Sequence, residues 1–191
     1  MVESIALFVE DYAHREIVGA IVDREASAAG VTPRLDWRTS TRGFGRVAKE
    51  LGRFTKTLSS SDGSLPDMLI VATDGNCVET AARRRELSIP DLGIPTVFAV
   101  PDPHIERWLL LDGAAFKQVL GVGCQAPDQK CDRDRYKNLL AIAVADSGTQ
   151  PLLGGLEHAG DIVKAMDLDA AARGDRSLDT FLKDLRAGLR H

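Results

Sequence analysis

The chain has 191 residues, with 24 lysines and arginines against 28 aspartates and glutamates, so its formal net charge is −4. This length is typical of one domain with a substantial core, and the acidic balance excludes a general electrostatic attraction to nucleic acid or anionic membranes. The longest apolar runs are strand-sized and no basic-then-apolar leader begins the chain, so neither a membrane-spanning helix nor a secretory signal is expected.

Cysteine usage indicates a reducing compartment. Cys77, Cys124 and Cys131 are odd in number, form no CxxC pair, and are not followed by histidines at zinc spacing. We therefore expect free thiols in a reducing environment, and a cytoplasmic protein.

Four segments predict the strands of one sheet. Three are continuous apolar runs typical of buried strands, and one alternates polar and apolar residues as an edge strand does, with Pro33 near its start. They lie at residues 4–9, 67–73 and 95–100, with the alternating run at 32–38. Because helix-like sequence follows each strand, we expect a mostly parallel sheet.

Helical periodicity fills the intervals between these strands. The first helix has an inner apolar stripe that includes Ile17 and Ile21, and Gly30 follows it where a C-terminal cap would lie. Helices are predicted at about 13–29, 43–58, 77–87, 103–111 and 114–120.

Helices dominate the remainder of the chain. After an irregular stretch at 121–131, they are predicted at 132–145, 156–166 and 177–189, with a polar break at 169–175 and Ser177 as a plausible N-cap. The expected architecture is an α/β core over 1–121, Rossmann-like, with a four-stranded sheet flanked by helices. A helical C-terminal extension over 122–191 would pack on that core to give one compact domain.

Acidic residues follow three of the predicted strands. Glu10 comes after the first, Asp74 after the third, and Asp102 and Glu106 after the fourth. The carboxyl ends of parallel strands meet at one edge of a sheet, which is where open α/β sheets bind ligands. Carboxylate and amide oxygens suit hard divalent cations. The pattern therefore predicts a Mg²⁺ or Mn²⁺ site formed by Glu10, Asp74, Asn76 and Glu106.

Each acidic residue also has an ordinary structural explanation, which for Glu10 is a solvated position at the start of a loop and for Glu106 a first-turn position favoured by the helix dipole. Asp74-Gly75-Asn76 reads as a turn in which Asn76 caps the next helix, while Gly75 would let both oxygen-bearing side chains face one ion. Asp102 reads as an N-cap with Pro103 in the first helical position. Their joint placement after buried strands favours the functional interpretation.

A basic stripe follows the second predicted strand. Its members are spaced by four, three, four and three residues, so they project from one helical face. They are Arg42, Arg46, Lys49, Arg53 and Lys56. Arg84, on the helix after Asp74, adds a second basic position. The stripe predicts a track for nucleic-acid phosphates; the alternative is a solvated helix face.

Two further features compete with the acidic edge. Gly43-Phe-Gly45-Arg-Val-Ala48 matches the dinucleotide pattern G-x-G-x-x-A, but it follows the second strand and lacks a strand-terminal acid about 20 residues later. His14, in the first turn of a helix near Glu10, suits a proton shuttle, although such a histidine is more often a surface residue.

The acidic motifs resemble those of Toprim domains, the metal-binding catalytic modules of topoisomerases, primases and overcoming-lysogenization-defect nucleases. Phe8-Val9-Glu10-Asp11 and Val71-Ala-Thr-Asp74-Gly-Asn76 carry the resemblance. Small standalone Toprim-like proteins of bacterial defence islands are also similar in the Pro101–Asp112 stretch and the Asp175–Phe181 tail. Asn76 departs from the family pattern because it replaces the second acid of a D-x-D motif. Glu106 could supply the missing carboxylate.

The resemblance implies a Mg²⁺- or Mn²⁺-dependent nuclease in anti-phage defence, with Glu10, Asp74 and Glu106 as catalytic residues, nucleic acid as substrate and an ATPase as a possible partner. The alternative is a non-catalytic subunit that binds a protein partner through the acidic edge or the helical tail. Asn76 and the incomplete D-x-D motif favour that alternative.

Overall fold

The structure, a computed structural model, describes residues 2–40, 44–60 and 65–190. Its sheet has four parallel strands in the order β2-β1-β3-β4. The strands are β1 (Ser4–Val9), β2 (Arg34–Thr39), β3 (Met68–Ala72) and β4 (Thr96–Ala99). The expected α/β class with a parallel four-stranded sheet is confirmed, and the alternating segment is an edge strand as predicted.

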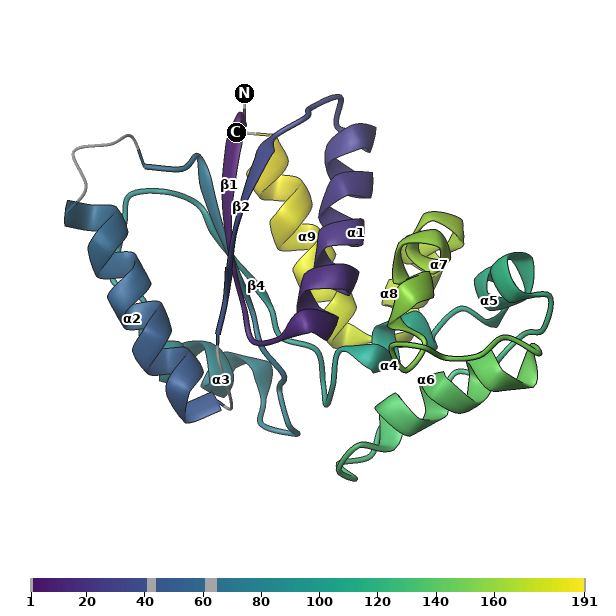
Figure 1. Cartoon of the computed structure of the whole chain (residues 1–191). Coiled ribbons are helices and arrows are strands. Elements are labelled where there is room, and N and C mark those ends of the chain that lie inside the picture. The colour runs from purple at the N-terminus through teal and green to yellow at the C-terminus, as the bar shows by residue number, and fades with distance from the viewer. Residues whose placement is uncertain (1, 41–43, 61–64, 191) are drawn as a thin grey trace.

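Helices cover both faces of this sheet (Figure 1). The first part of the chain provides α1 (Tyr12–Ala28), α2 (Phe44–Ser60), α3 (Thr80–Leu87), α4 (Glu106–Leu109) and α5 (Gly113–Leu120). The remainder provides α6 (Arg135–Asp146), the 3₁₀ turn η1 (Leu156–His158), α7 (Ala159–Ala165), α8 (Leu168–Gly174) and α9 (Arg176–Leu189). Within the described ranges, none of these helices combines the length and apolar character needed to cross a membrane.

Alternate residues of β1 enter two separate hydrophobic cores, because successive side chains of a strand point to opposite faces. Ile5, Leu7 and Val9 belong to the larger core, which α1 and α9 cover. Ala6 and Phe8 belong to a smaller core beneath α2 and α3. Figure 1 shows α1 and α9 on one side of the sheet and α2 and α3 on the other. The sheet is thus the middle of three layers.

The end of α1 follows the capping pattern that the sequence predicts. Gly30 has a φ of 73°, in the left-handed region that glycine adopts without steric cost. Its N–H donates to the carbonyl of Ser27 at 3.0 Å, and the N–H of Val31 donates to that of Ala26 at 3.0 Å. This pair of bonds is a Schellman motif, and it turns the chain back toward β2.

The helices after residue 121 share the larger core with the sheet. In α9, Leu178, Phe181 and Leu185 are fully buried in that core. An ion pair between Glu25 of α1 and Arg186 of α9, at 2.6 Å, joins the two helices. The C-terminal helix therefore completes the layer that α1 begins.

The helix predicted at 103–111 is shorter than expected. Only Glu106–Leu109 is α-helical, and the Asp102–Pro103 peptide bond is cis. The interpretation of Asp102 as an N-cap with Pro103 in the first helical position is therefore wrong. Instead, the Asp102 N–H donates to Ser177 Oγ at 3.2 Å, and its Oδ2 accepts from Gln129 Nε2 at 2.5 Å.

The start of α9 also differs from expectation. The predicted polar break at 169–175 is largely occupied by α8, and the N-cap of α9 is Asp175 rather than Ser177. Asp175 accepts from the Leu178 N–H at 2.9 Å and pairs with Arg107, both side chains being buried. A carboxylate can form a charge-assisted hydrogen bond with the buried guanidinium, which a serine hydroxyl cannot do. The N-cap of α9 is therefore Asp175 and not Ser177.

The expectation of three free thiols is corrected by a disulfide. Cys77 and Cys131, 54 residues apart, are bonded, with their Cα atoms 5.9 Å from each other. Cys124 is free and half-buried, and burial raises the pKa of its thiol to about 11. Pairing over such a separation cannot be deduced from sequence spacing. Disulfides persist mainly in oxidising compartments, so the thiol argument for a cytoplasmic protein no longer holds.

Candidate functional site

The ends of β1 and β3 meet at the point where the sheet reverses its winding. From β1 the chain moves to β2 on one side, and β3 and β4 lie on the other side. In open α/β sheets this switch point, outside the carboxyl ends of the strands, is the usual ligand crevice. Glu10 follows β1 directly, and Asp74 comes two residues after β3. The topology thus places both acids at the crevice position.

The Glu10 carboxylate is held against the end of β3. Its Oε2 accepts hydrogen bonds from the Thr73 hydroxyl at 2.5 Å and from the Asp74 N–H at 3.1 Å. The Glu10 N–H in turn donates to the carbonyl of Ala72 at 2.9 Å. These bonds fix the carboxylate beside Asp74, and they use only one of its two oxygens.

Asp74 is the centre of a hydrogen-bonded cluster. Its Oδ1 accepts from the Ile105 N–H at 2.9 Å and lies 3.2 Å from Nε2 of His14, while its Oδ2 lies 2.9 Å from Nδ1 of His104. Burial alone would raise the pKa of this carboxyl, but the two histidines outweigh it and hold the pKa well below its ordinary value. Asp74 is therefore ionised at neutral pH.

His14 is fully buried, at 0 % exposure, so its interpretation as a surface histidine is wrong. Its Nδ1 lies 2.8 Å from Oδ1 of Asp11, the residue that caps α1 by accepting the His14 N–H. Burial opposes the imidazolium charge, but Asp74 and Asp11 outweigh it and raise the pKa of His14 to about 10. The Asp11-x-x-His14 spacing, a cap followed by its hydrogen-bond partner, was the sequence signal for this contact.

His104 was not predicted to have a role. Its hydrogen bond to Asp74 raises its pKa above the ordinary value, against the effect of partial burial. The ring also lies 6.0 Å, centre to centre, from the ring of Tyr136. Nothing in the residues around His104 indicates this position, because it depends on how the Pro101–Ile105 segment folds back onto the end of β3.

Glu106 is also buried, at 1 % exposure, and neither carboxylate oxygen has a hydrogen-bond partner among the described residues. The Nζ of Lys137 on α6 lies 4.0 Å from Oε1 of Glu106. Burial raises the pKa of Glu106, and the charge of Asp74 adds to the effect. A buried carboxylate without a donor is rare in proteins, so this side chain is unusual.

Asn76 and Gly75 have roles in the backbone conformation of this turn that the sequence did not predict. Asn76 has a φ of 49°, its N–H donates to the Pro103 carbonyl at 3.0 Å, and its side chain is exposed. It does not cap α3, whose N-cap is Glu79. Gly75 is required by close approach: a Cβ there would lie 2.8 Å from the Pro101 carbonyl oxygen. The left-handed residues of this turn are Asn76 and Cys77, not the glycine.

The carboxylates at this edge determine how a metal ion could be held. The described part of the chain contains no group of three or more His, Cys, Asp or Glu side chains arranged to hold one ion. Mg²⁺ at phosphate-transfer sites, however, is commonly held by one or two carboxylates together with water and substrate phosphates. Glu10, with one oxygen unused by the bonds above, and Asp74 are the two carboxylates that follow neighbouring strands at this edge. Metal binding by Glu10, Asp74, Asn76 and Glu106 stays a prediction.

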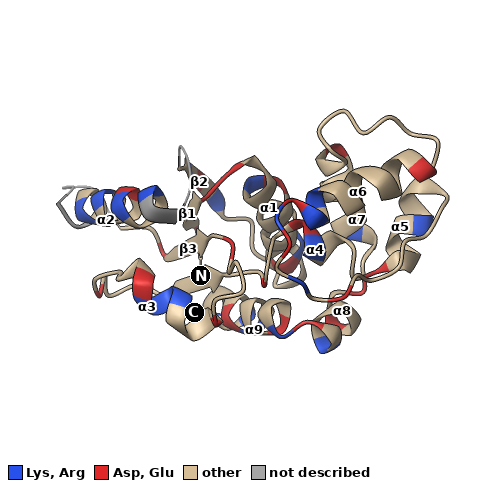
Figure 2. Cartoon of the chain, turned by 90° about the horizontal axis from the view of Figure 1, so that it is seen from below, with Lys and Arg blue, Asp and Glu red and all other residues tan. Residues whose placement is uncertain are grey.

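The basic stripe lies on the solvent face of α2. Arg46, Lys49, Arg53 and Lys56 are exposed, and Figure 2 shows basic residues along this helix, whereas Val47 on the opposite face is fully buried. Arg42 lies outside the described residues, as does Gly43 of the dinucleotide pattern.

Arg84 has a structural environment of its own. Its guanidinium pairs with Asp184 of α9 at 2.8 Å and lies 5.2 Å above the ring of Phe98. These contacts link α3 to α9 across the edge of β4, which is a packing role. Binding of nucleic acid by Arg84 stays a prediction.

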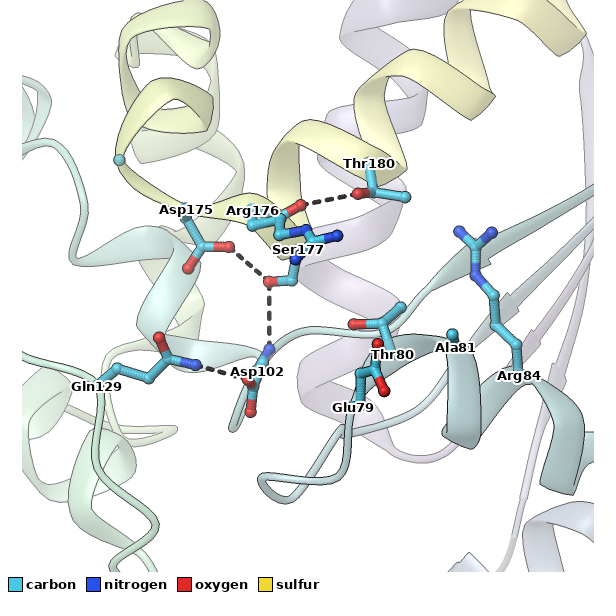
Figure 3. A pocket seen from close by; sticks show the side chains of 11 residues that line it. Glu79, Thr80, Ala81, Arg84, Asp102, Gln129, Asp175, Arg176, Ser177 and Thr180 are labelled. Atoms are coloured by element: carbon cyan, nitrogen blue, oxygen red, sulfur yellow. Dashed lines mark hydrogen bonds between the residues drawn. The ribbon is translucent and has the colours of Figure 1, made fainter.

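A pocket of about 340 Å³ opens between α3 and the start of α9 (Figure 3). The Ser177 hydroxyl lies at its base, donating to Asp175 at 2.5 Å and accepting from the Asp102 N–H at 3.2 Å. Acidic and basic side chains both line it, including Glu79, Arg84 and Arg176. The pocket shares Asp102 with the segment that folds onto Asp74, but it is separate from the Glu10 edge.

Comparison with protein-family models, curated proteins and solved structures gave no match for this chain.

Proposed function

We propose that this protein is a metal-dependent nuclease that hydrolyses phosphodiester bonds of DNA or RNA. The observation that carries the proposal is the pairing of Glu10 with Asp74 at the switch point of the sheet, where the Glu10 carboxylate accepts the Asp74 N–H at 3.1 Å. Acids that follow two neighbouring strands at a ligand crevice suit a hard divalent cation and the phosphate that it attracts.

Glu10 and Asp74 would hold the cation, and Mg²⁺ or Mn²⁺ would supply polarisation of the phosphate and a lowered pKa for the attacking water. Thr73 fixes the Glu10 carboxylate through its hydroxyl. His14 and His104 orient Asp74 and keep it ionised, since both lie within 3.2 Å of its oxygens. The proposal also keeps Glu106 as a residue of the reaction edge, within electrostatic range of Asp74.

Substrate binding is assigned to the exposed basic face of α2. Arg46, Lys49 and Arg53 lie on one side of the helix, opposite the residues that pack on the sheet. Cations at this spacing contact successive phosphates without reading bases, so the proposed binding is independent of sequence. Arg42 and Lys56 would extend the same track.

The Toprim-like family, a role in phage defence and an ATPase partner belong to the proposal as well. They follow from the resemblance of the Glu10 and Asp74 motifs and of the Pro101–Asp112 and Asp175–Phe181 segments. The sheet, parallel and four-stranded, is compatible with that family.

The test is cleavage of supercoiled plasmid and of tRNA by the purified full chain, with Mg²⁺, Mn²⁺ or EDTA. Glu10→Gln and Asp74→Asn should each lower the metal-dependent rate by roughly 100-fold or more, because each removes a charge that would hold the cation and so activate the attacking water. Asp161→Asn, an exposed isosteric change on α7, should leave the rate unchanged. Equal cleavage by all four proteins would reject the assignment.

A second candidate is a non-catalytic subunit that uses the acidic edge to bind a protein partner. The observation in its favour is that both Asp74 oxygens already accept from protein groups, namely the Ile105 N–H and His104. Calorimetric titration with Mg²⁺ and Mn²⁺ separates the two candidates. The nuclease predicts a saturable site that Asp74→Asn abolishes, whereas the binding subunit predicts no saturable heat.

A further inference from the structure

The strand β2 is an open edge of the sheet. Within the described chain it is hydrogen-bonded to β1 on one side only, and Figure 2 shows it as the outermost strand, with α2 and α1 on opposite sides of the sheet. The other edge, β4, is crossed by the contacts of Arg84 with Phe98 and Asp184. An edge strand presents unpaired backbone groups to which another strand can add, and β2 has no role in the proposed nuclease.

The outward backbone groups of β2 belong to Leu35, Trp37 and Thr39. The N–H groups of Arg34 and Ser40 each donate to a carbonyl on the β1 side at 2.8 Å. Backbone groups alternate in direction along a strand, so the even-numbered residues bond to β1 and the odd-numbered residues face away. The structure, over its described ranges, gives the N–H groups of these three odd-numbered residues no acceptor.

The side chains on the α2 side of β2 are charged and alternate in sign. Arg34, Asp36 and Arg38 are exposed, and they line a cavity beside Phe54 of α2. Arg34 binds only Oδ2 of Asp36, at 3.0 Å. Oδ1 of Asp36 and the Arg38 guanidinium have no ion-pair partner among the residues described. Charges on an edge strand prevent pairing with strands at random, so only a strand of complementary charge order fits.

A second copy of β2 has that complementary order in one register. In an antiparallel pair, charges directly opposite each other stabilise when their signs differ and destabilise when they are alike. A pairing centred on Trp37 places Asp36 of each copy opposite Arg38 of the other. A pairing centred on Asp36 or on Arg38 places like charges opposite each other instead. One centred on Leu35, near the start of the strand, leaves most of β2 unpaired.

We propose that the protein forms a two-fold symmetric dimer in which the β2 strands of two copies pair antiparallel, centred on Trp37. The two sheets then join into one continuous sheet. The pairing adds about six backbone hydrogen bonds, because each residue pair of the hydrogen-bonded kind exchanges two. On the α1 side, the half-buried Trp37, whose ring packs on Gly19 of α1, faces its own copy. Aromatic pairs across strands add further stabilisation.

The dimer goes beyond the proposed nuclease and does not rest on it. The interface is isologous, since the same strand of both copies forms it. Its two-fold axis is perpendicular to the sheet, so the two α2 helices lie on the same face. The exposed cations of both helices therefore lie on one side of the assembly, whereas the two Glu10–Asp74 edges lie at opposite ends.

The test is sedimentation equilibrium of the full chain across the micromolar range. We expect the mass to rise from 20.7 kDa to twice that value as the concentration increases. Asp36→Arg and Arg38→Asp each place like charges opposite each other, and each should weaken dimerisation by roughly 10-fold or more. The double variant restores opposite charges and should regain the dimer. Arg133→Asp, at a side chain 95 % exposed, is the control and should change nothing.

The backbone pairing has a test of its own. Thr39→Pro removes an outward N–H without affecting the bonds to β1, and it should weaken the dimer by roughly 10-fold, the effect of the two hydrogen bonds lost. Thr39→Ala keeps the N–H and should leave the dimer intact. Equal melting temperatures of the two variants in the monomeric state would show that the proline does not unfold the chain.

Cysteine cross-linking measures the register. Asp36→Cys and Arg38→Cys proteins, mixed and mildly oxidised, should form a disulfide between copies, because Cα atoms of such opposed residues lie about 4.5 Å apart. Either protein alone should cross-link less, because its two cysteines lie on the diagonal, about 7–8 Å apart.

A protein that stays at 20.7 kDa at the highest concentrations overturns the proposal. A dimer that both single charge reversals leave intact, or that the double variant does not restore, overturns it in favour of another surface. A dimer that survives Thr39→Pro, or cysteine variants that cross-link better alone than mixed, overturns the pairing centred on Trp37. None of these measurements uses cleavage: an active monomer refutes only the dimer, and an inactive dimer refutes only the nuclease.

Discussion

The imidazole Nε2 of His14 lies 3.2 Å from Oδ1 of Asp74, in the interior of the protein at the carboxyl edge of the sheet. The contact joins the first turn of α1 to the end of β3, and Asp11 holds the other imidazole nitrogen at 2.8 Å. Because His14 is fully buried, its charge and that of Asp74 interact with little screening by solvent. The protonation of this pair is therefore linked to folding.

The stability of the protein should fall as the pH rises above neutrality. His14 titrates near 6.5 when unfolded and near 10 in the fold, so its contribution is complete below pH 6.5 and is lost between pH 6.5 and 10. The fold lowers the pKa of Asp74 from 3.8. Its ionised carboxylate therefore stabilises the protein above pH 3.8, and this stabilisation is lost in acid. Urea unfolding from pH 5.5 to 10 measures the slope. In His14→Gln the alkaline slope should be much reduced; an identical slope in both proteins contradicts the linkage.

Nucleic-acid binding through α2 should depend steeply on salt. Replacing Arg46, Lys49 and Arg53 by alanine should weaken binding to duplex DNA. It should also reduce the slope of log K against log salt by about 0.9 for each phosphate that the variant no longer neutralises. Fluorescence anisotropy at several NaCl concentrations gives both quantities. Lys183→Ala on α9 is the control, and an unchanged slope in the triple variant would show that this face does not hold the backbone.

The disulfide should be a substantial source of stability. Closing a loop between Cys77 and Cys131 restricts the unfolded chain, an effect of about 2–4 kcal/mol for native disulfides. Cys131→Ser should lose that amount in urea unfolding, and a reducing agent should bring the wild type to the same value. Alkylation of unfolded, unreduced protein should modify Cys124 only. Modification of all three cysteines would refute the bond.

Gly75→Ala should destabilise the turn that carries Asp74. The added Cβ would lie 2.8 Å from the Pro101 carbonyl oxygen, a backbone atom that cannot move without disturbing the bond it accepts from the Gly75 N–H at 2.7 Å. We expect a loss of about 1–3 kcal/mol, the usual cost of overpacking. Gly52→Ala in α2, where a Cβ meets no atom within 4 Å, should instead stabilise by about 0.5–1 kcal/mol. Equal effects of the two changes would contradict the close approach.

Asp175→Ala should be among the most damaging single changes. It leaves the buried Arg107 without its partner, which costs about 3–5 kcal/mol. Asp167→Ala removes the N-cap of α8, an exposed aspartate that accepts the Ala170 N–H at 2.9 Å, and should cost only about 1 kcal/mol. Chemical denaturation compares the two, and similar losses would mean that the Arg107 pair contributes little.

The sheet could be predicted from the sequence because its signals are local. Continuous apolar runs become the buried strands β1 and β3, and the alternating segment becomes the edge strand β2. Gly30 marks the end of α1 because the left-handed conformation there favours glycine. Glu10 and Asp74 were found for the same reason, since their positions follow from where strands end.

The sequence predictions that proved wrong concern features that depend on contacts between distant segments. Ser177 and Asp175 are both good caps in isolation, and the buried Arg107, 68 residues away, decides between them. His14 reads as a surface residue until Asp74 is placed beside it. The pairing of Cys77 with Cys131 likewise depends on the path of the irregular segment. Local sequence contains no information on these partners.

The unequal division of the hydrophobic core has an energetic consequence. Among the residues that the structure describes, the core beneath α2 and α3 contains fewer buried apolar residues than the core that α1 and α9 cover. Local opening is cheapest where least apolar surface is buried, so α2 should detach from the sheet more readily than α1. The amide protons of α2, the helix that presents the cations, should therefore exchange with solvent sooner than those of α1. A polyanion bound along α2 should slow this local opening.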